Sequence, residues 1–385
     1  MKYGMKYTKI KAINEYVSES INPMKSPDTV FEMYSVPIFD TGHPEYLRGD
    51  EIASNKVVVK KNDVLLCKIN PRINRVWVVA DESEHINIAS SEWIVVRNKS
   101  YNPHFLAWYF RSPRFKQLMV SEVTGIGGSL TRAQPKAVAE YPVPVLARAE
   151  QDKITIVLNK IASLIEARKQ ELRRLDELIK ARFVEVFGDP IGNTKGWRKS
   201  SLSDVCKKIY GGGTPSKSHS EYYEGTIPWV SPKDMKSNVI ADSIDHITEE
   251  AISNSTTNLV PEGAVLMVIR SGILKHSLPV AINAVAVTIN QDMKAFIPGE
   301  CITASFLRSY FKAIESDVLS GVRGVTADNI DFKNFQRRRI IIPPLDLQND
   351  FEEFCRQVDK SKAVIQKSLE EAQLLFDSLM QQYFG

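Results

Sequence analysis

Cysteine is scarce in this sequence, and its few occurrences are dispersed. The 385 residues include 4 cysteines, at Cys67, Cys206, Cys301 and Cys355, and no Cys-X-X-Cys motif. This spacing excludes a disulfide framework and a zinc finger, and it favours a protein of a reducing compartment.

Long apolar runs are also missing. The longest, residues 278–290, is about half the ~20 residues that a membrane span requires. The first residues, MKYGMKYTKIKAINEY, contain no apolar signal core. Because 43% of the residues are hydrophobic and 25% are charged, the chain has the composition of a globular protein. We therefore expect a cytoplasmic protein.

No excess of one charge dominates, since the net charge is only +4. Residues 1–150 and 191–340 are mildly basic, whereas residues 341–385 are acidic. The basic blocks are compatible with a polyanionic partner, although such small excesses also occur on ordinary solvated surfaces.

Motifs for catalysis and metal binding are absent. The 6 histidines form no HxxxH pair, so a metal site is not indicated. GGGTPSKS (211–218) lacks the glycine before lysine that a phosphate-binding loop requires, and neither Ser129 nor Ser271 lies in a GxSxG motif. The sequence favours a binding protein that carries no cofactor of its own.

An internal repeat is the most informative feature present. Residues 151–188 and 348–385 align without a gap at an offset of 197, with identical residues at both ends of the alignment (Gln151/Gln348 and Gly188/Gly385). Further upstream, VLLCKI (64–69) matches VLMVIR (265–270), and FLAWYF (105–110) matches FLRSYF (306–311). The chain is therefore predicted to be a tandem repeat of a globular domain followed by a helix.

The second part of each repeat is predicted to be one long helix. Residues 145–187 and 345–384 contain none of the 19 glycines and 19 prolines, and apolar residues recur every 3.5 positions, as in a coiled coil. Gly188 suits a helix C-terminus, Asp346 is a candidate N-cap, and ~35 helical residues would extend roughly 50 Å. The predicted seam comprises Ile154, Leu158, Ile161, Ile165, Leu172, Leu175, Ile179, Phe351, Val358, Ile365, Leu369 and Phe376.

Two helices of equal length, each with one apolar stripe, can bury both stripes against each other. Duplicated units tend to pair about a twofold axis, which makes the helices antiparallel. The alternative is that each helix packs only on its own globular domain. The predicted fold is mixed α/β, with domains at 1–146 and 189–345 and spacer helices at 147–188 and 346–385.

The same strand in each repeat is followed by a basic loop, NPRINR in the first and RSGILKH in the second. Arginine suits guanine edges, asparagine suits adenine, and lysine suits phosphate. A glycine-rich loop also recurs before the strand that leads to each long helix, at 124–132 and 320–326. The candidate DNA contacts in these loops are Lys68, Asn70, Arg72, Asn74, Arg75, Ser129, Arg132, Arg270, Ser271, Lys275, Arg323 and Thr326.

Four segments resemble the specificity subunit of type I restriction-modification systems: GGGTPSKSHSEYYEGTIPWVSPKDM (211–235), VLMVIRSG (265–272), IIIPPLDLQNDF (340–351) and LIKARFVEVFGDP (178–190). In the first globular part, YSVPIFDTGH (34–43) only loosely parallels IPWVSPKDM (227–235). The first of the four segments adds Thr214, Lys217 and Lys233 to the candidate DNA contacts.

The resemblance implies a noncatalytic subunit with two target recognition domains, each reading one half of a split, asymmetric DNA sequence. It implies two modification subunits that bring S-adenosylmethionine and methylate adenine N6, and motor-nuclease subunits that use ATP and Mg²⁺. Three alternatives remain from the residues alone: a stand-alone DNA-binding regulator, a coiled-coil adapter between two proteins, and an RNA-binding module.

Overall fold

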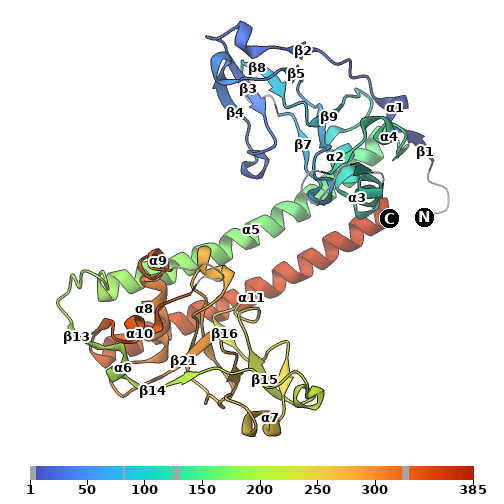
Figure 1. The fold of residues 1–385 in the computed structure, drawn as a ribbon. Helices are drawn as coiled ribbons and strands as arrows, with labels where there is room; N and C mark the ends of the chain where they lie inside the picture. Colours follow the sequence, from blue (N-terminus) through green and yellow to red (C-terminus); the bar gives the residue numbers. More distant parts are fainter. Residues whose placement is uncertain (1–5, 81–82, 122, 125–130, 323–328) are drawn as a thin grey trace. The chain divides into compact units, whose positions relative to one another are not determined.

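The computed structural model describes residues 6–80, 83–121, 123–124, 131–322 and 329–385. The chain divides into two compact units, one of Met1–Arg168 with Ser368–Gly385 and one of Lys169–Lys367. Each unit thus contains one β-rich domain and part of both long helices, α5 (Arg148–Phe187) and α11 (Leu345–Phe384). Figure 1 traces the chain through both units.

The first unit is built on a five-stranded sheet, in the order β2-β5-β8-β3-β4, and a three-stranded sheet, β7-β6-β9. Parallel pairing of β3 with β8 contrasts with the antiparallel pairs around them. The strands are β1 Tyr7–Lys9, β2 Ser20–Ile21, β3 Val30–Tyr34, β4 Glu45–Arg48, β5 Lys56–Val58, β6 Val64–Cys67, β7 Val76–Val78, β8 Ile86–Ala89, β9 Trp93–Val96, β10 Val123–Thr124, β11 Arg132–Ala133 and β12 Pro142–Pro144. The shorter helices are α1 Ile10–Ile13, α2 Pro103–Arg111, α3 Pro113–Ser121 and α4 Pro135–Val138.

The second unit also contains a five-stranded sheet, in the order β14-β21-β18-β19-β16, and a three-stranded sheet, β17-β15-β20. Its strands are β13 Arg198–Ser201, β14 Cys206–Gly211, β15 Ile227–Val230, β16 Val239–Ile240, β17 His246–Ile247, β18 Val265–Val268, β19 Val280–Asn283, β20 Thr288–Ile289, β21 Met293–Pro298 and β22 Arg339–Ile342. Its shorter helices are α6 Leu202–Val205, α7 Glu249–Ser253, α8 Ala304–Ala313, α9 Glu315–Ser320 and α10 Phe332–Gln336. The parallel pair β15–β20 corresponds to β3–β8, so the loose parallel between residues 34–43 and 227–235 reflects the same place in the fold.

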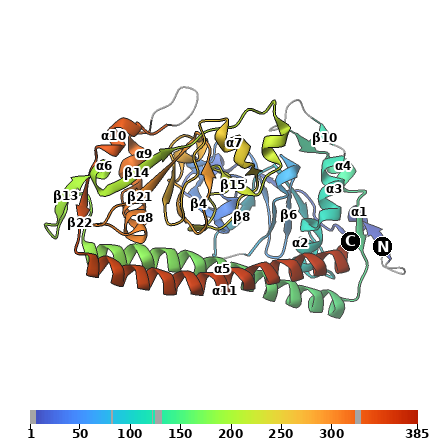
Figure 2. The same cartoon turned by 90° about the horizontal axis from the view of Figure 1, so that it is seen from below.

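Both long helices are 40 residues long, about 60 Å at 1.5 Å per residue. In the first unit the start of α5 shares a core with the end of α11, where Phe384 lies 5.6 Å from Phe105 of α2 between ring centroids. In the second unit the end of α5 meets the start of α11, where Phe187 lies 5.3 Å from Phe351 and 4.8 Å from Phe306 of α8. Within each unit the two helices are therefore antiparallel, and Figure 2 shows the last turns of α5 beside the first turns of α11, with α8 against them.

All twelve predicted seam positions are buried or half-buried. Six are buried: Ile154, Leu158, Ile165, Ile179, Phe351 and Val358. The other six are half-buried: Ile161, Leu172, Leu175, Ile365, Leu369 and Phe376. Lys362, which interrupts the apolar stripe, donates to Asp176 Oδ1 of α5 at 2.7 Å.

A buried glutamine near the start of each long helix fastens that helix to its domain. Gln151 Oε1 accepts from the backbone N–H of Asn102, the N-cap of α2, at 2.8 Å. Gln348 Oε1 likewise accepts from the N–H of Thr303, the N-cap of α8, at 2.9 Å. The identical pair Gln151/Gln348 of the repeat thus has one structural role in both units.

The mixed α/β fold class, with two β-rich domains linked by long helices that pack together, is confirmed, whereas one local prediction is wrong. Asp346 lies in the first turn of α11 and is not its N-cap, because the helix already begins at Leu345.

Candidate nucleic-acid interface

The basic loop of the first unit is a tight excursion between β6 and β7. Asn70 and Asn74 both adopt the left-handed conformation, with φ of 50° and 54°, which asparagine tolerates better than most residues. Between them Pro71 begins a 3-10 turn that leaves Arg72 exposed. Asn74 Oδ1 and Arg75 Nε are buried and have no hydrogen-bond partner among the described residues.

Backbone hydrogen bonds fix this loop to two other segments. The N–H of Lys68 donates to Glu92 O at 3.0 Å, in the turn before β9. The N–H of Ala133 donates to Lys68 O at 2.9 Å, and Ile69 forms a bridge with Arg132. The segment that follows the glycine-rich loop therefore lies beside the basic loop.

The second unit contains the same junction. The N–H of Ile269 donates to Asp292 O at 2.8 Å, in the turn before β21. The N–H of Ile330 donates to Ile269 O at 2.9 Å, and Arg270 forms a bridge with Asn329. Because these bonds involve only backbone atoms, the junction is shared although the side chains differ.

An acidic residue at the equivalent turn pairs with a different arginine in each unit. Glu92 holds Arg132 at 3.3 Å in the first unit. Asp292 holds Arg270, a residue of the basic loop itself, at 2.6 Å in the second. Both arginines keep nearly half of their side chains exposed, at 44% and 47%, so each is oriented by its partner and still accessible.

The rest of the second basic loop projects outward. Ser271 accepts a hydrogen bond from the N–H of Ile273 at 3.4 Å, and Lys275 is exposed. Ser129, Arg323 and Thr326, which were predicted as contacts in the glycine-rich loops, lie outside the described residues.

An open pocket of about 650 Å³ in the second unit brings together two more predicted residues, Lys217 and Lys233. Lys233 Nζ lies 2.6 Å from Asp245 Oδ2, and this hydrogen bond raises the pKa of Lys233. Tyr223 and Trp229 line the same pocket, with ring centroids 5.9 Å apart. The pocket thus combines cations with an aromatic surface, as nucleic-acid sites do.

The glycine-rich turn 211–213 supports this pocket by close packing. A Cβ at Gly212 would lie 1.7 Å from Asn290 O, and one at Gly213 would lie 2.6 Å from the backbone nitrogen of Thr257. Trp229 Nε1 donates to Gly213 O at 3.0 Å, while the Thr214 hydroxyl donates to Gln291. The turn therefore serves packing within the domain.

Sequence reasoning missed several residues at these sites. Tyr223, Trp229 and Asn290 line the pocket, and Glu92 and Asp292 orient the arginines. The aromatic residues lie inside the motif at 211–235, which was a usable signal. The two acids lie in separate turns, and no local pattern marks them.

Metal and membrane sites are not apparent in the described part of the chain. Its histidine, cysteine and acidic side chains form no group of three or more that could hold a metal ion. None of its helices combines the length and hydropathy needed to cross a membrane. All four cysteines are free thiols.

Residues 194–374 match the family model described as the type I restriction modification DNA specificity domain. The chain is 34% identical over 212 residues to the EcoR124I/EcoR124II type I restriction enzyme specificity subunit of Escherichia coli, covering 54% of this chain and 50% of that protein. It is 31% identical over 137 residues to the MjaIX specificity subunit of Methanocaldococcus jannaschii, covering 34% of this chain and 30% of that protein. The chain therefore spans half or less of the length of these relatives.

Two solved structures resemble the whole chain. A chain from "Structural basis underlying complex assembly and conformational transition of the type I R-M system" aligns with a TM-score of 0.56 at 19% identity, covering 100% of this chain and 98% of that one. The type I restriction-modification S subunit from M. genitalium aligns with a TM-score of 0.58 at 11% identity, with the same coverage. At these identities the likeness concerns the fold.

Proposed function

We propose that this chain belongs to the family of type I restriction-modification DNA specificity subunits. On that premise, it selects a bipartite DNA target. Residues 1–146 and 189–345 are the two target recognition domains, and each reads one half-site. The observation that carries the proposal is the backbone junction that recurs in both units and presents a basic loop at the end of β6 and of β18.

The shared junction explains how one fold can read two unlike half-sites. Its hydrogen bonds require no particular side chain, so the residues of each loop can differ while the loop keeps its place. In the first unit the exposed Arg72 and the asparagines suit base edges. In the second, Arg270 is oriented by Asp292 and flanked by Ser271, which gives a different set of donors and acceptors.

The remaining candidate contacts suit phosphate and groove positioning. Lys68, Arg75 and Arg132 belong to the first unit, whereas Thr214, Lys217, Lys233 and Lys275 belong to the second. Ser129, Arg323 and Thr326 stay predictions. Phosphate contacts supply affinity and orientation but little sequence information, so these residues are expected to govern the salt dependence of binding.

Catalysis belongs to partner subunits. Two modification subunits would bring S-adenosylmethionine and methylate adenine N6, and motor-nuclease subunits would use ATP and Mg²⁺ for restriction. Apolar residues exposed on the outer faces of the long helices support a docking role, among them Val364 and Leu374, each 71% exposed.

Methylome sequencing of a host that expresses this chain with its neighbouring modification gene tests the proposal. The expected result is N6-methyladenine in one bipartite motif that disappears when this chain is deleted. Gel shifts with and without the modification subunit distinguish a stand-alone regulator, which would bind tightly alone. Methylation that persists unchanged without this chain would refute the proposal.

A further inference from the structure

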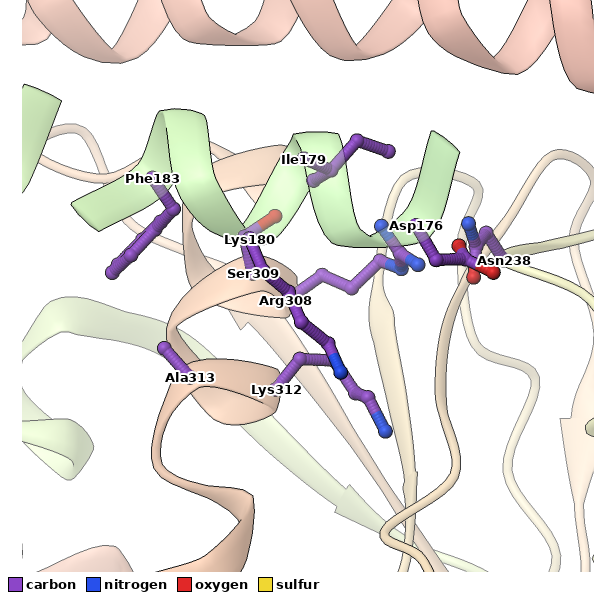
Figure 3. A pocket seen from close by; sticks show the side chains of 9 residues that line it. All are labelled: Asp176, Ile179, Lys180, Phe183, Asn238, Arg308, Ser309, Lys312 and Ala313. Carbon is purple, nitrogen blue, oxygen red and sulfur yellow. The ribbon is translucent and has the colours of Figure 1, made fainter. Parts of the chain in front are cut away.

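A small pocket in the second unit lies apart from the basic loop. It has a volume of about 250 Å³ and lies between α5 and α8. Figure 3 shows its lining residues, with Asp176, Ile179, Lys180 and Phe183 on α5 and Arg308 on α8 extending toward Asp176.

Three polar groups in this pocket have unused hydrogen-bonding capacity. Arg308 is only 8% exposed, and its Nε has no partner among the described residues. The same holds for Ser309 Oγ and for Asn238 Nδ2. Buried polar atoms are nearly always satisfied, so three unsatisfied groups in one pocket indicate a missing ligand.

The charge of Arg308 is not neutralised by an ion pair with any described residue. Asp359 and Asp176 lie within electrostatic range of it. The Asp176 carboxylate, however, is already bonded to Lys362, at 2.7 Å. Burial lowers the pKa of Arg308, but a guanidinium stays charged in proteins. A buried cation without a bonded partner is costly to keep, which again points to an anionic group that binds here.

The repeat explains why the pocket is open. At an offset of 201, Ser309 corresponds to Trp108 and Arg308 to Ala107. In the first unit the Trp108 ring lies 5.5 Å from that of Phe376, and its Nε1 donates to Asn159 at 2.8 Å. Serine in place of tryptophan leaves this space empty in the second unit, whereas Trp108 occupies the equivalent place in the first.

We infer that this pocket binds a carboxylate side chain of the modification subunit that docks on the second unit. This inference rests on the proposed function. A guanidinium, a hydroxyl and an amide N–H₂ match a carboxylate, and a volume of 250 Å³ admits one side chain. Val184, one helical turn beyond Lys180 of the pocket, is 52% exposed, so an exposed apolar side chain lies beside the pocket, as at a protein contact. In the first unit Trp108 takes the place of Ser309, so the inference concerns the second unit alone.

Two variants of the full chain, co-expressed with the modification subunit, test the inference. Arg308→Leu removes the charge, and Ser309→Trp fills the pocket as Trp108 fills its counterpart. Each variant is expected to weaken binding of one copy of the modification subunit by at least about tenfold and to leave the other unchanged, as native mass spectrometry over a concentration series can show. Arg356→Leu, at an exposed position of α11, is the matched control and should change neither copy.

Melting of the free chain separates a ligand-binding role from a structural one. If Arg308 serves a ligand, Arg308→Leu should leave the melting temperature unchanged or raise it, because the cost of burying the charge disappears. A lower melting temperature with both copies still bound at wild-type affinity would overturn the inference. So would protection of the free chain by inorganic phosphate or acetate together with unchanged subunit binding, since the site would then serve a free anion. Failure of the wild-type complex to direct methylation would instead count against the proposed function.

Discussion

Replacing Gln348 with alanine is expected to destabilise the second unit strongly. This side chain is fully buried, and its Nε2 donates to Cys301 O and Pro343 O at 3.0 and 2.9 Å. With the acceptor bond from the Thr303 N–H, three backbone groups would lose their partner. At roughly 1–3 kcal/mol for each unsatisfied buried group, with partial relaxation, the expected loss is about 3–5 kcal/mol.

Urea denaturation of the full chain, followed by tryptophan fluorescence, measures this loss. With a urea dependence of about 1–3 kcal/mol per molar, the transition of the second unit should move down by roughly 1–5 M. The matched control is Gln357→Ala on the same helix, because Gln357 is exposed and bonds only Glu353, at 3.0 Å. The control should cost about 0.5 kcal/mol or less.

The comparison between the two glutamines adds a second constraint. The Gln151 side chain donates one hydrogen bond, to Leu146 O, whereas that of Gln348 donates two. Gln151→Ala should therefore lower the free energy of unfolding less than Gln348→Ala does, and the loss should appear in the first unit. If Gln348→Ala shifts the transition no further than Gln357→Ala does, the assignment of the glutamines as fasteners of the long helices is wrong.

The other predictions concern recognition, spacing and ionisation. Arg270→Ala should lower affinity by about 1–3 kcal/mol and alter one half-site, as methylome sequencing and binding titrations can test. Exchange of residues 189–345 for the equivalent segment of a type I specificity subunit should change one half-site only, and a change in both would contradict independent reading by the two domains. Insertion of four residues, about one turn, after Lys169 of α5 and at the facing position of α11 should lengthen the unread gap in the methylated motif without changing either half-site. Burial raises the pKa of the Cys206 thiol to about 12 from 9.0, so Cys206 should be alkylated at pH 8 much more slowly in the folded chain than in the unfolded chain. The stability that the protonated Cys206 contributes should be lost as the pH rises through 9 toward 12, which denaturation at alkaline pH can measure.

The repeat and the long helices could be predicted because their signals are local and redundant. Absence of glycine and proline, an apolar period of 3.5 residues and a constant offset all point to the same elements. The apolar period nevertheless missed Phe183 and Phe187, which leave the helix seam to enter the domain core of the second unit. A heptad pattern describes one contact face, and these residues serve another.

The candidate interface was less predictable because its geometry depends on contacts between distant segments. The pairing of Arg270 with Asp292, and of Arg132 with Glu92, requires knowing which turn lies beside which loop. No spacing in the sequence encodes that neighbourhood. The repeat indicates that Glu92 and Asp292 are equivalent, because they are 200 residues apart. It does not indicate their partners, because Arg132 and Arg270 occupy different positions in the two units.

This difference clarifies what the duplication preserves. Backbone hydrogen bonds hold both loops at the same junction, and they constrain side chains very little. Ion pairs at the junction are free to change, so Ile69 in one unit corresponds to Arg270 in the other. Under the proposed function, a duplicated domain built in this way diverges in the sequence that it reads while it keeps the position from which it reads, and reading two unlike half-sites requires that property.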